Sequence, residues 1–175
     1  MMIGLNLPDL NLNQTYRWDL AGIDGLQVAR SLFGDSVSQI APFQSIEAKV
    51  GDCTCSILRL CEGNFRIVGR GRATELEQAL QQVATQYRVW VRQFDWLSAI
   101  VIPESVGLAI LPELATTKIP YRLRGMSSDR AIPARIEGIS VLIWRHTIAG
   151  IPVFELHTAT QDAETMRKRL ELAIQ

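Results

Sequence analysis

The sequence predicts an α+β fold, with a mostly antiparallel sheet built from two β-hairpins, each followed by a helix, and with the helices packed on one face. Two segments, 53–68 and 141–158, alternate apolar and polar residues on either side of a short turn sequence. Each is followed by a segment, 74–87 or 162–174, with apolar residues at helical spacing. Composition agrees, because 47% hydrophobic and 21% charged residues are typical of a globular chain and exclude a disordered one.

The chain of 175 residues has the length of one ordinary domain. We expect residues 1–20 to form an N-terminal arm or loop and residues 21–175 to form a single α+β domain. The N-terminus lacks the basic and apolar regions of a signal peptide, and no stretch reaches the ~18 apolar residues of a membrane span. Three cysteines, an odd number, argue against a secreted disulfide framework. These features predict a cytoplasmic protein.

The first predicted element is a short helix over 23–33. Leu26, Ala29 and Phe33 recur on one side of it, and Gly34 is a typical helix stop.

The first hairpin pairs 53–61 with 65–68 around Glu62-Gly63-Asn64. If Gly63 and Asn64 form the turn, Leu58 lies opposite Gly69, and the core face carries Leu58, Leu60, Phe65 and Ile67. Successive side chains in a strand point to opposite faces. The outward face is then expected to carry the three thiols together with Arg59, Arg66, Arg70 and Arg72.

A helix follows, with Thr74 and Glu77 at the spacing of a capping box. Its end is left open by the sequence, because no Gly or Pro occurs between Thr74 and Ile102. The helix either runs to about Phe94 or Leu97, or ends near Tyr87 and is followed by a strand over 88–92.

The middle of the chain is expected to be rich in strands. Residues 99–102 predict a buried strand that ends at Pro103. Residues 107–123 resemble short strand pieces confined to edges by Pro112 and Pro120. Residues 125–133 predict an exposed loop.

The second hairpin pairs 141–147 with 153–158 around a turn near Ala149 and Gly150, and a helix over 162–174 closes the chain. This register sets His146 opposite Val153, Trp144 opposite Glu155 and Leu142 opposite His157. His146, Glu155 and His157 then share one face. They are a candidate catalytic or metal-binding group, and a solvated hairpin face is the alternative.

Metal and cofactor signals are weak elsewhere. Cys53, Cys55 and Cys61 lack the fourth ligand of a tetrahedral zinc site, so we expect ordinary thiols, no metal and no cofactor. The glycines at 69 and 71 precede a helix start, as in phosphate-binding loops, but no phosphate-loop motif is complete. The pattern favours a strand exit with flexible turn residues, and anion binding there with help from Arg70 and Arg72 is the alternative.

The charge is balanced overall but unevenly distributed. Lys+Arg and Asp+Glu each number 18, and 15 of the basic residues are Arg. Residues 116–145 hold six basic and two acidic groups. The arginine-rich surface expected from this pattern supplies the candidate anion- or partner-binding residues, which are Arg59, Arg66, Arg70, Arg72, Arg122 and Arg124.

We expect a non-catalytic cytosolic protein-interaction module, such as an adaptor or a small subunit of a larger assembly, because no catalytic motif is present and exposed Arg and Trp mark interfaces. Two alternatives remain open. One is an RNA-binding or other nucleic-acid-binding module, or a ribonucleoprotein subunit, that uses the Arg-rich hairpin face. The other is an enzyme with a site around His146, Glu155 and His157. A protein partner is expected, nucleic acid and a homo-oligomer are alternatives, and no membrane is involved.

Overall fold

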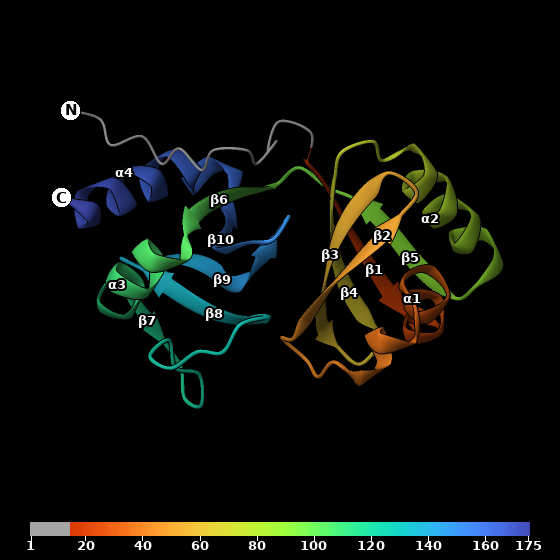
Figure 1. Cartoon of the computed structure of the whole chain (residues 1–175), viewed down its shortest axis with the longest axis horizontal. Coiled ribbons are helices and arrows are strands. Elements are labelled where there is room, and N and C mark those ends of the chain that lie inside the picture. Colours follow the sequence, from red (N-terminus) through yellow and green to blue (C-terminus); the bar gives the residue numbers. More distant parts are fainter. Residues whose placement is uncertain (1–14) are drawn as a thin grey trace. The chain divides into compact units, whose positions relative to one another are not determined.

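The computed structural model of the chain describes residues 15–175 (Figure 1). Within them the chain divides into two compact units, of which the first ends at Phe94 and the second runs from Asp95 to Gln175. Each unit combines a five-stranded antiparallel sheet with helices, so the predicted α+β class is confirmed. Of the expected arm 1–20, residues 1–14 lie outside the described residues, and residues 15–20 belong to a strand.

The sheet of the first unit has the strand order β2-β3-β4-β1-β5, with every neighbouring pair antiparallel. Its elements are β1 (Thr15–Gly22), α1 (Gly25–Phe33), the 3₁₀ helix η1 (Asp35–Gln39), β2 (Ser45–Val50), β3 (Cys53–Cys61), β4 (Asn64–Arg70), α2 (Thr74–Gln86) and β5 (Val89–Gln93).

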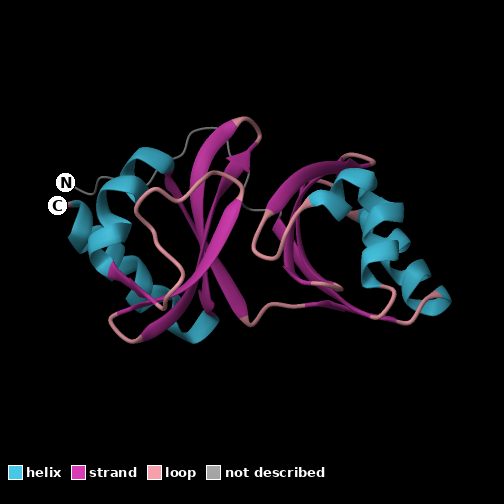
Figure 2. Ribbon diagram, turned by 90° about the horizontal axis from the view of Figure 1, so that it is seen from below, coloured by secondary structure: helices cyan, strands magenta, loops and turns pink. Residues whose placement is uncertain are grey.

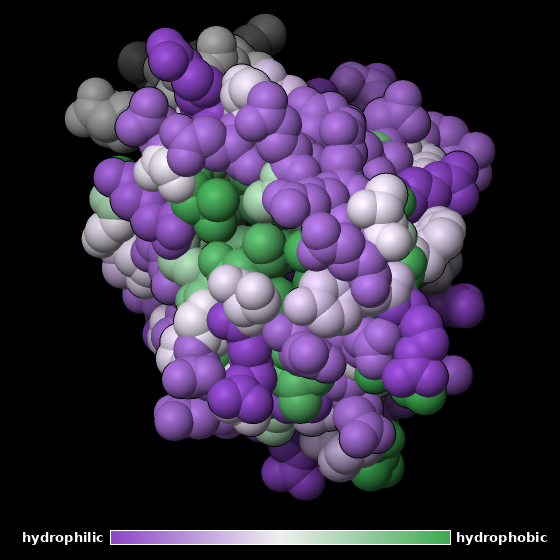
Figure 3. All heavy atoms as spheres, turned by 90° about the vertical axis from the view of Figure 1, so that its right-hand side faces the viewer, coloured by the Kyte–Doolittle hydropathy of each residue, from purple (hydrophilic) through white to green (hydrophobic). Residues whose placement is uncertain are grey.

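Both α-helices of this unit cover the same face of the sheet (Figure 2). We call this face the inner face. The core packed there includes Trp18, Leu20, Val28, Phe33, Phe65, Ile67, Leu76 and Leu80. Gly69 allows α2 to approach β4, because a Cβ there would lie 2.9 Å from the Cys53 sulfur and 3.2 Å from the Leu76 side chain. On the side that carries α1 and α2, Figure 3 shows apolar side chains at the surface among polar ones.

The predicted register of the first hairpin is wrong. Gly69 lies opposite Cys55 rather than Leu58, the turn is at Glu62 and Gly63, and the register shifts between Arg59 and Cys61. Because the displacement is three residues, an odd number, it exchanges the two faces of β3. Cys53, Cys55 and Ile57 therefore join Phe65 and Ile67 in the core, while the buried Leu58 lies on the opposite face.

The helices of this unit follow the sequence more closely. α1 ends at Phe33 and is followed by Gly34 with φ 95°, as expected for a helix stop. The capping box is wrong, since Ala73 occupies the N-cap position and no side-chain cap bond forms. α2 ends at Gln86, and Val89–Gln93 pairs with β1, so the strand alternative for this segment is confirmed.

The sheet of the second unit has the order β6-β10-β9-β8-β7, again antiparallel throughout. Its elements are β6 (Leu97–Pro103), α3 (Glu104–Leu114), β7 (Ala115–Thr117), β8 (Arg130–Ile136), β9 (Ile139–Ile148), β10 (Ile151–Ala159), the 3₁₀ helix η2 (Thr160–Asp162) and α4 (Ala163–Ile174).

α3 and α4 pack against one face of this sheet (Figure 2). The core there includes Ile100, Ile102, Leu111, Ile143, Phe154, Leu156, Met166 and Leu170. Gly107 sets the distance between α3 and β10, because a Cβ at that position would lie 2.2 Å from the Phe154 ring. None of the helices described within 15–175 has the length and apolar character needed to span a membrane.

The strand pieces predicted over 107–123 are wrong for most of that range, which is helical up to Leu114. Pro112 lies near the end of α3, where the missing amide removes only one intrahelical bond. The predicted loop over 125–133 ends earlier, at Asp129, because β8 begins at Arg130 and includes Pro133. Pro133 pairs with Leu142 of β9, while the pairing of β8 with β7 on its other side covers only residues 134–136.

The second hairpin has the predicted register. His146 lies opposite Val153, Trp144 opposite Glu155 and Leu142 opposite His157. Ala149 and Gly150 form the turn with φ values of 50° and 80°, the left-handed conformation that a two-residue hairpin turn requires. The final helix, α4, agrees with the predicted range.

Candidate functional site

His146, Glu155 and His157 form a cluster on the second hairpin of the second unit. His146 comes from β9, and the other two come from β10. The Nε2 of His146 lies 2.8 Å from Oε2 of Glu155, and the Nε2 of His157 lies 2.8 Å from Oε1. An ionised carboxylate can only accept hydrogen bonds, so each imidazole then donates its Nε2–H. One carboxylate thus joins two imidazoles and can hold or pass a proton between them.

Trp144 completes this cluster. Its ring stacks on His146 with centroids 4.0 Å apart and meets His157 edge-on at 6.0 Å. All four residues lie on the sheet face opposite the one that packs against α3 and α4. The exposed fractions of His146, Glu155 and His157 are 2%, 1% and 3%. The sequence correctly placed the three on one face, but the alternative of a solvated hairpin face is wrong, because the group is a buried polar network.

The hairpin arginines do not share one face. Arg59 lies opposite Phe65 and therefore on the inner side, whereas Arg66 and Arg70 lie on the outer side of the same sheet. Arg59 donates hydrogen bonds to three backbone carbonyls, those of Ile40, Cys61 and Glu62. Its role in the structure is to tie the end of the hairpin to the segment before β2.

Arg66 and Arg70 also hold the sheet together. Arg66 makes a bidentate ion pair with Asp19 of the neighbouring β1, with N–O distances of 2.9 and 3.1 Å. Its guanidinium also lies 5.1 Å from the centre of the Phe94 ring. Arg70 donates a hydrogen bond of 2.9 Å to the Ser56 hydroxyl across the hairpin. Both side chains are thus engaged within their own unit.

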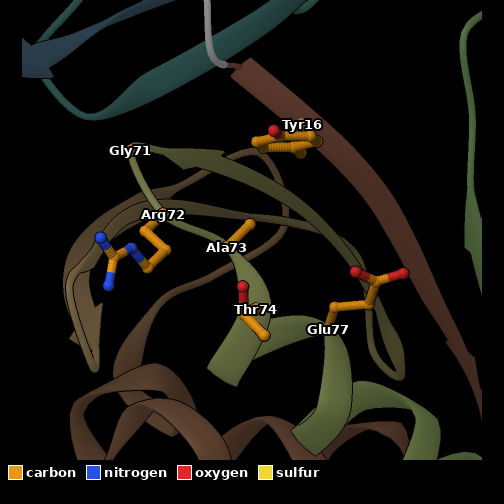
Figure 4. A pocket seen from close by; sticks show the side chains of 6 residues that line it. All are labelled: Tyr16, Gly71, Arg72, Ala73, Thr74 and Glu77. Carbon is orange, nitrogen blue, oxygen red and sulfur yellow. The ribbon is translucent and has the colours of Figure 1, made fainter.

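Arg72 is different, because it lines a pocket of about 340 Å³ at the start of α2. Tyr16 lies above the helix start, with Arg72 on one side and Glu77 on the other (Figure 4). Thr74 completes the polar lining. The arrangement provides an exposed cation, a hydroxyl and helix amides, but Glu77 adds a negative charge that opposes a simple anion.

Arg122 and Arg124 belong to the second unit, in the exposed stretch before β8. Arg124 forms an ion pair with Glu113, whose side chain is also exposed. The six candidate residues are thus divided between two units and four kinds of environment.

Two of the three thiols form a buried pair, whereas the sequence predicted all three on the outward face. Cys53 and Cys55 are fully buried, with sulfurs 3.8 Å apart, and Cys61 is exposed. A hydrogen bond from the Cys55 thiol, aided by the Arg70 amide, lowers the pKa of Cys53 from 9.0 to about 7 despite burial. The pKa of Cys55 is raised by that same partner and by burial. No group of three or more His, Cys, Asp or Glu residues suited to a metal occurs in 15–175.

No family model matches the chain, and no curated protein matches its sequence. Its fold is similar to that of glycine cleavage system aminomethyltransferase T from Bartonella henselae, with a TM-score of 0.68 and 12% identity. That likeness covers 89% of this chain and 43% of the other, so this chain spans less than half of that enzyme. A chain of heterotetrameric sarcosine oxidase from Corynebacterium sp. U-96, in complex with pyrrole 2-carboxylate, has a TM-score of 0.62 and 18% identity. There the likeness covers 91% of this chain and 79% of the other.

These neighbours correct the functional prediction. Both are enzymes or parts of enzymes, so the expected non-catalytic interaction module is wrong. Neither structure supports the RNA-binding alternative or a homo-oligomer. At 12% and 18% identity the likeness shows the fold alone.

Proposed function

We propose that this chain is a subunit of a hetero-oligomeric enzyme that acts on an N-substituted glycine such as sarcosine. The observation that carries the proposal is the likeness to the heterotetrameric sarcosine oxidase chain, which extends over 91% of this chain and 79% of that one. A match that covers most of both chains favours a corresponding subunit over a shared local motif.

The substrate class follows from the chemistry that the two neighbours share. Sarcosine is N-methylglycine, and an aminomethyltransferase of the glycine cleavage system handles a one-carbon unit attached to nitrogen. Pyrrole 2-carboxylate, present in the oxidase structure, carries an N–H next to a carbon that bears a carboxylate. Together these features favour a secondary amine beside a carboxylate as the group recognised by the assembly.

Protein partners are part of this proposal, because the oxidase is a heterotetramer. The expected cytoplasmic location remains a prediction. Of the candidate arginines, we propose an anion-binding role for Arg72 alone. Its position at the pocket at the start of α2 supports this role. Arg59, Arg66 and Arg70 have structural partners that account for their positions.

The experiment is purification of the tagged chain from its source organism under native conditions, followed by measurement of oxygen uptake with sarcosine. Glycine serves as the control substrate, because it lacks the N-methyl group. We expect a complex of defined stoichiometry whose oxygen uptake depends on sarcosine and is inhibited by pyrrole 2-carboxylate. A strain that lacks the chain should lose this activity and regain it when the chain is supplied.

The proposal is overturned if the chain elutes at its own mass of 19.6 kDa and its deletion leaves sarcosine-dependent oxygen uptake unchanged. A complex that oxidises neither sarcosine nor another N-substituted glycine would likewise reject the substrate class.

A further inference from the structure

We propose that the pocket at the start of α2 binds a small zwitterionic amino acid, whose carboxylate lies at Arg72 and whose ammonium group lies at Glu77. This inference rests on the proposed function, because that function makes an N-substituted glycine the amino acid expected in the pocket. It adds a binding site on this chain, whereas the proposed function leaves the place of the substrate within the complex open.

The connection from β4 to α2 forms one wall of the pocket. β4 ends at Arg70 and α2 begins at Thr74. Between them, Gly71 has a φ of 94°, and a Cβ there would lie 3.3 Å from the Asp52 carbonyl oxygen. Glycine adopts this conformation without strain, so the chain can turn there into the helix. The turn leaves Ala73 buried and the Arg72 side chain exposed at the pocket.

Tyr16 of β1 supplies an aromatic wall from the neighbouring strand. Its ring stacks on that of Trp18, with centroids 5.9 Å apart and an angle of 29° between the planes. Trp18 is almost fully buried in the core of the unit, whereas Tyr16 is 36% exposed and lines the pocket. The core therefore holds the Tyr16 ring in place while part of it stays open to a ligand.

The two charged side chains of the pocket have opposite signs. Arg72 and Glu77 are both exposed and lie on either side of Tyr16 (Figure 4). Within residues 15–175, neither side chain takes part in an ion pair. A simple anion attracted by Arg72 is repelled by Glu77, and for a simple amine the two effects are reversed. A zwitterion is attracted at both ends, so the balanced charge of the pocket favours it.

Each polar part of an N-methylated amino acid finds a suitable group. The guanidinium of Arg72 can donate two parallel hydrogen bonds to a carboxylate, and the Thr74 hydroxyl can donate another. The carboxylate of Glu77 accepts from the ammonium group. The face of the Tyr16 ring attracts a methylated ammonium through its quadrupole. The pocket volume of about 340 Å³ lies within the range of small-molecule sites.

The experiment is a titration of the full chain, labelled with ¹⁵N, in which amide chemical shifts report the binding of sarcosine. Acetate and methylamine serve as control ligands, because each carries only one of the two charges. We expect sarcosine to shift the amides of residues 71–77 and to bind roughly tenfold more tightly than either control ligand.

Three side chains are then tested by substitution. Arg72→Gln and Glu77→Gln each remove one charge and should weaken sarcosine binding roughly tenfold. Their controls are the exposed Arg122→Gln in the second unit and Glu75→Gln, which lies in the first turn of α2 but does not line the pocket. Both should bind as the wild type does. Tyr16→Leu should weaken binding roughly threefold, whereas Tyr16→Phe keeps the ring and the affinity.

The outcomes separate this site from the proposed function. If acetate or inorganic phosphate binds as tightly as sarcosine and Glu77→Gln does not weaken sarcosine binding, the pocket is a simple anion site and the proposal is overturned. If the native complex oxidises sarcosine but the chain does not bind it, the site is wrong and the proposed function stands. If the chain binds sarcosine through Arg72 and Glu77 but the complex is inactive on N-substituted glycines, the site stands and the proposed function is wrong.

Discussion

Glu155 and His146 meet across the second hairpin, with Oε2 and Nε2 2.8 Å apart although nine positions separate them in the sequence. The turn at Ala149 and Gly150 brings them together, because it sets Trp144 opposite Glu155 and places His146 diagonally next to it. Since both side chains are almost fully buried, removing one of them leaves the other as a buried polar group without its partner.

Removal of the Glu155 carboxylate should therefore destabilise the protein. Glu155→Leu leaves two buried imidazoles without their acceptor, and we expect a loss of about 1–3 kcal/mol in the free energy of unfolding for each donor left unpaired. Glu155→Gln keeps one acceptor oxygen and should cost less. Urea denaturation measures both, with the exposed Glu171→Gln as the control. Equal stability of Glu155→Leu and the wild type would show that the network contributes nothing.

The Arg66–Asp19 pair should contribute more than a surface pair does. It joins β4 to β1 with side chains that are 13% and 20% exposed, whereas the side chains of Arg30 and Asp35 are 51% and 84% exposed. We expect Asp19→Asn to cost about 1.5–3 kcal/mol and Asp35→Asn less than about 0.5 kcal/mol. Denaturant titrations of both variants decide the matter, and similar losses would contradict the role assigned to burial.

Gly107 should not tolerate a side chain. A methyl group there would lie 2.2 Å from the Phe154 ring, so Gly107→Ala must displace α3 or the ring. We expect a loss of about 1–3 kcal/mol, although Ala alone would favour the helix by about 1 kcal/mol. Phe154→Leu in the same chain should recover part of this loss. A more stable Gly107→Ala variant, measured by thermal unfolding, would refute the close contact.

Acid should weaken the link between α1 and β5. Arg88 donates side-chain and backbone hydrogen bonds to Asp24, which hold the pKa of that carboxyl below 3.8. Since the folded pKa is the lower one, the stabilisation is present above 3.8 and is lost as the pH falls through the folded value. The difference in unfolding free energy between wild type and Asp24→Asn should therefore shrink as the pH falls below 3.8. A difference that stays constant down to strong acid would contradict this linkage.

Cys55 should control the acidity of Cys53. The largest cause that lowers the pKa of Cys53 to about 7 is the hydrogen bond from the Cys55 thiol. Cys55→Ala removes it while burial persists, so the pKa of Cys53 should rise toward 9.0. Thiolate absorbance as a function of pH, measured in a Cys61→Ser background, reports the change. An unaltered titration would show that Arg70 alone sets this acidity.

Local patterns were sufficient for several elements. The stop at Gly34 and the two-residue turn at Ala149 and Gly150 act through backbone conformation over a few residues. The second hairpin therefore had the predicted register, and the sequence correctly put His146, Glu155 and His157 on one face.

Other features depended on partners that are distant in the sequence. Whether 88–93 continues the helix or forms a strand depended on pairing with β1, more than sixty positions earlier. The first hairpin was predicted with its turn at Gly63 and Asn64, whereas the turn at Glu62 and Gly63 gives the register that buries Cys53, Cys55 and Ile57 beneath α1 and α2. In the observed register Arg59 lies on the opposite face of the sheet from Arg66 and Arg70.

By itself, the sequence determined the α+β class, the antiparallel hairpins and the His146–Glu155–His157 group, because periodicity and turn chemistry are short-range properties. Only the tertiary structure decided the two separate sheets, the burial of that group, the thiol pair and the place of β5 at the end of its sheet. Each of these depends on which strand lies beside which, and that choice is made by the burial of apolar area summed over the whole unit.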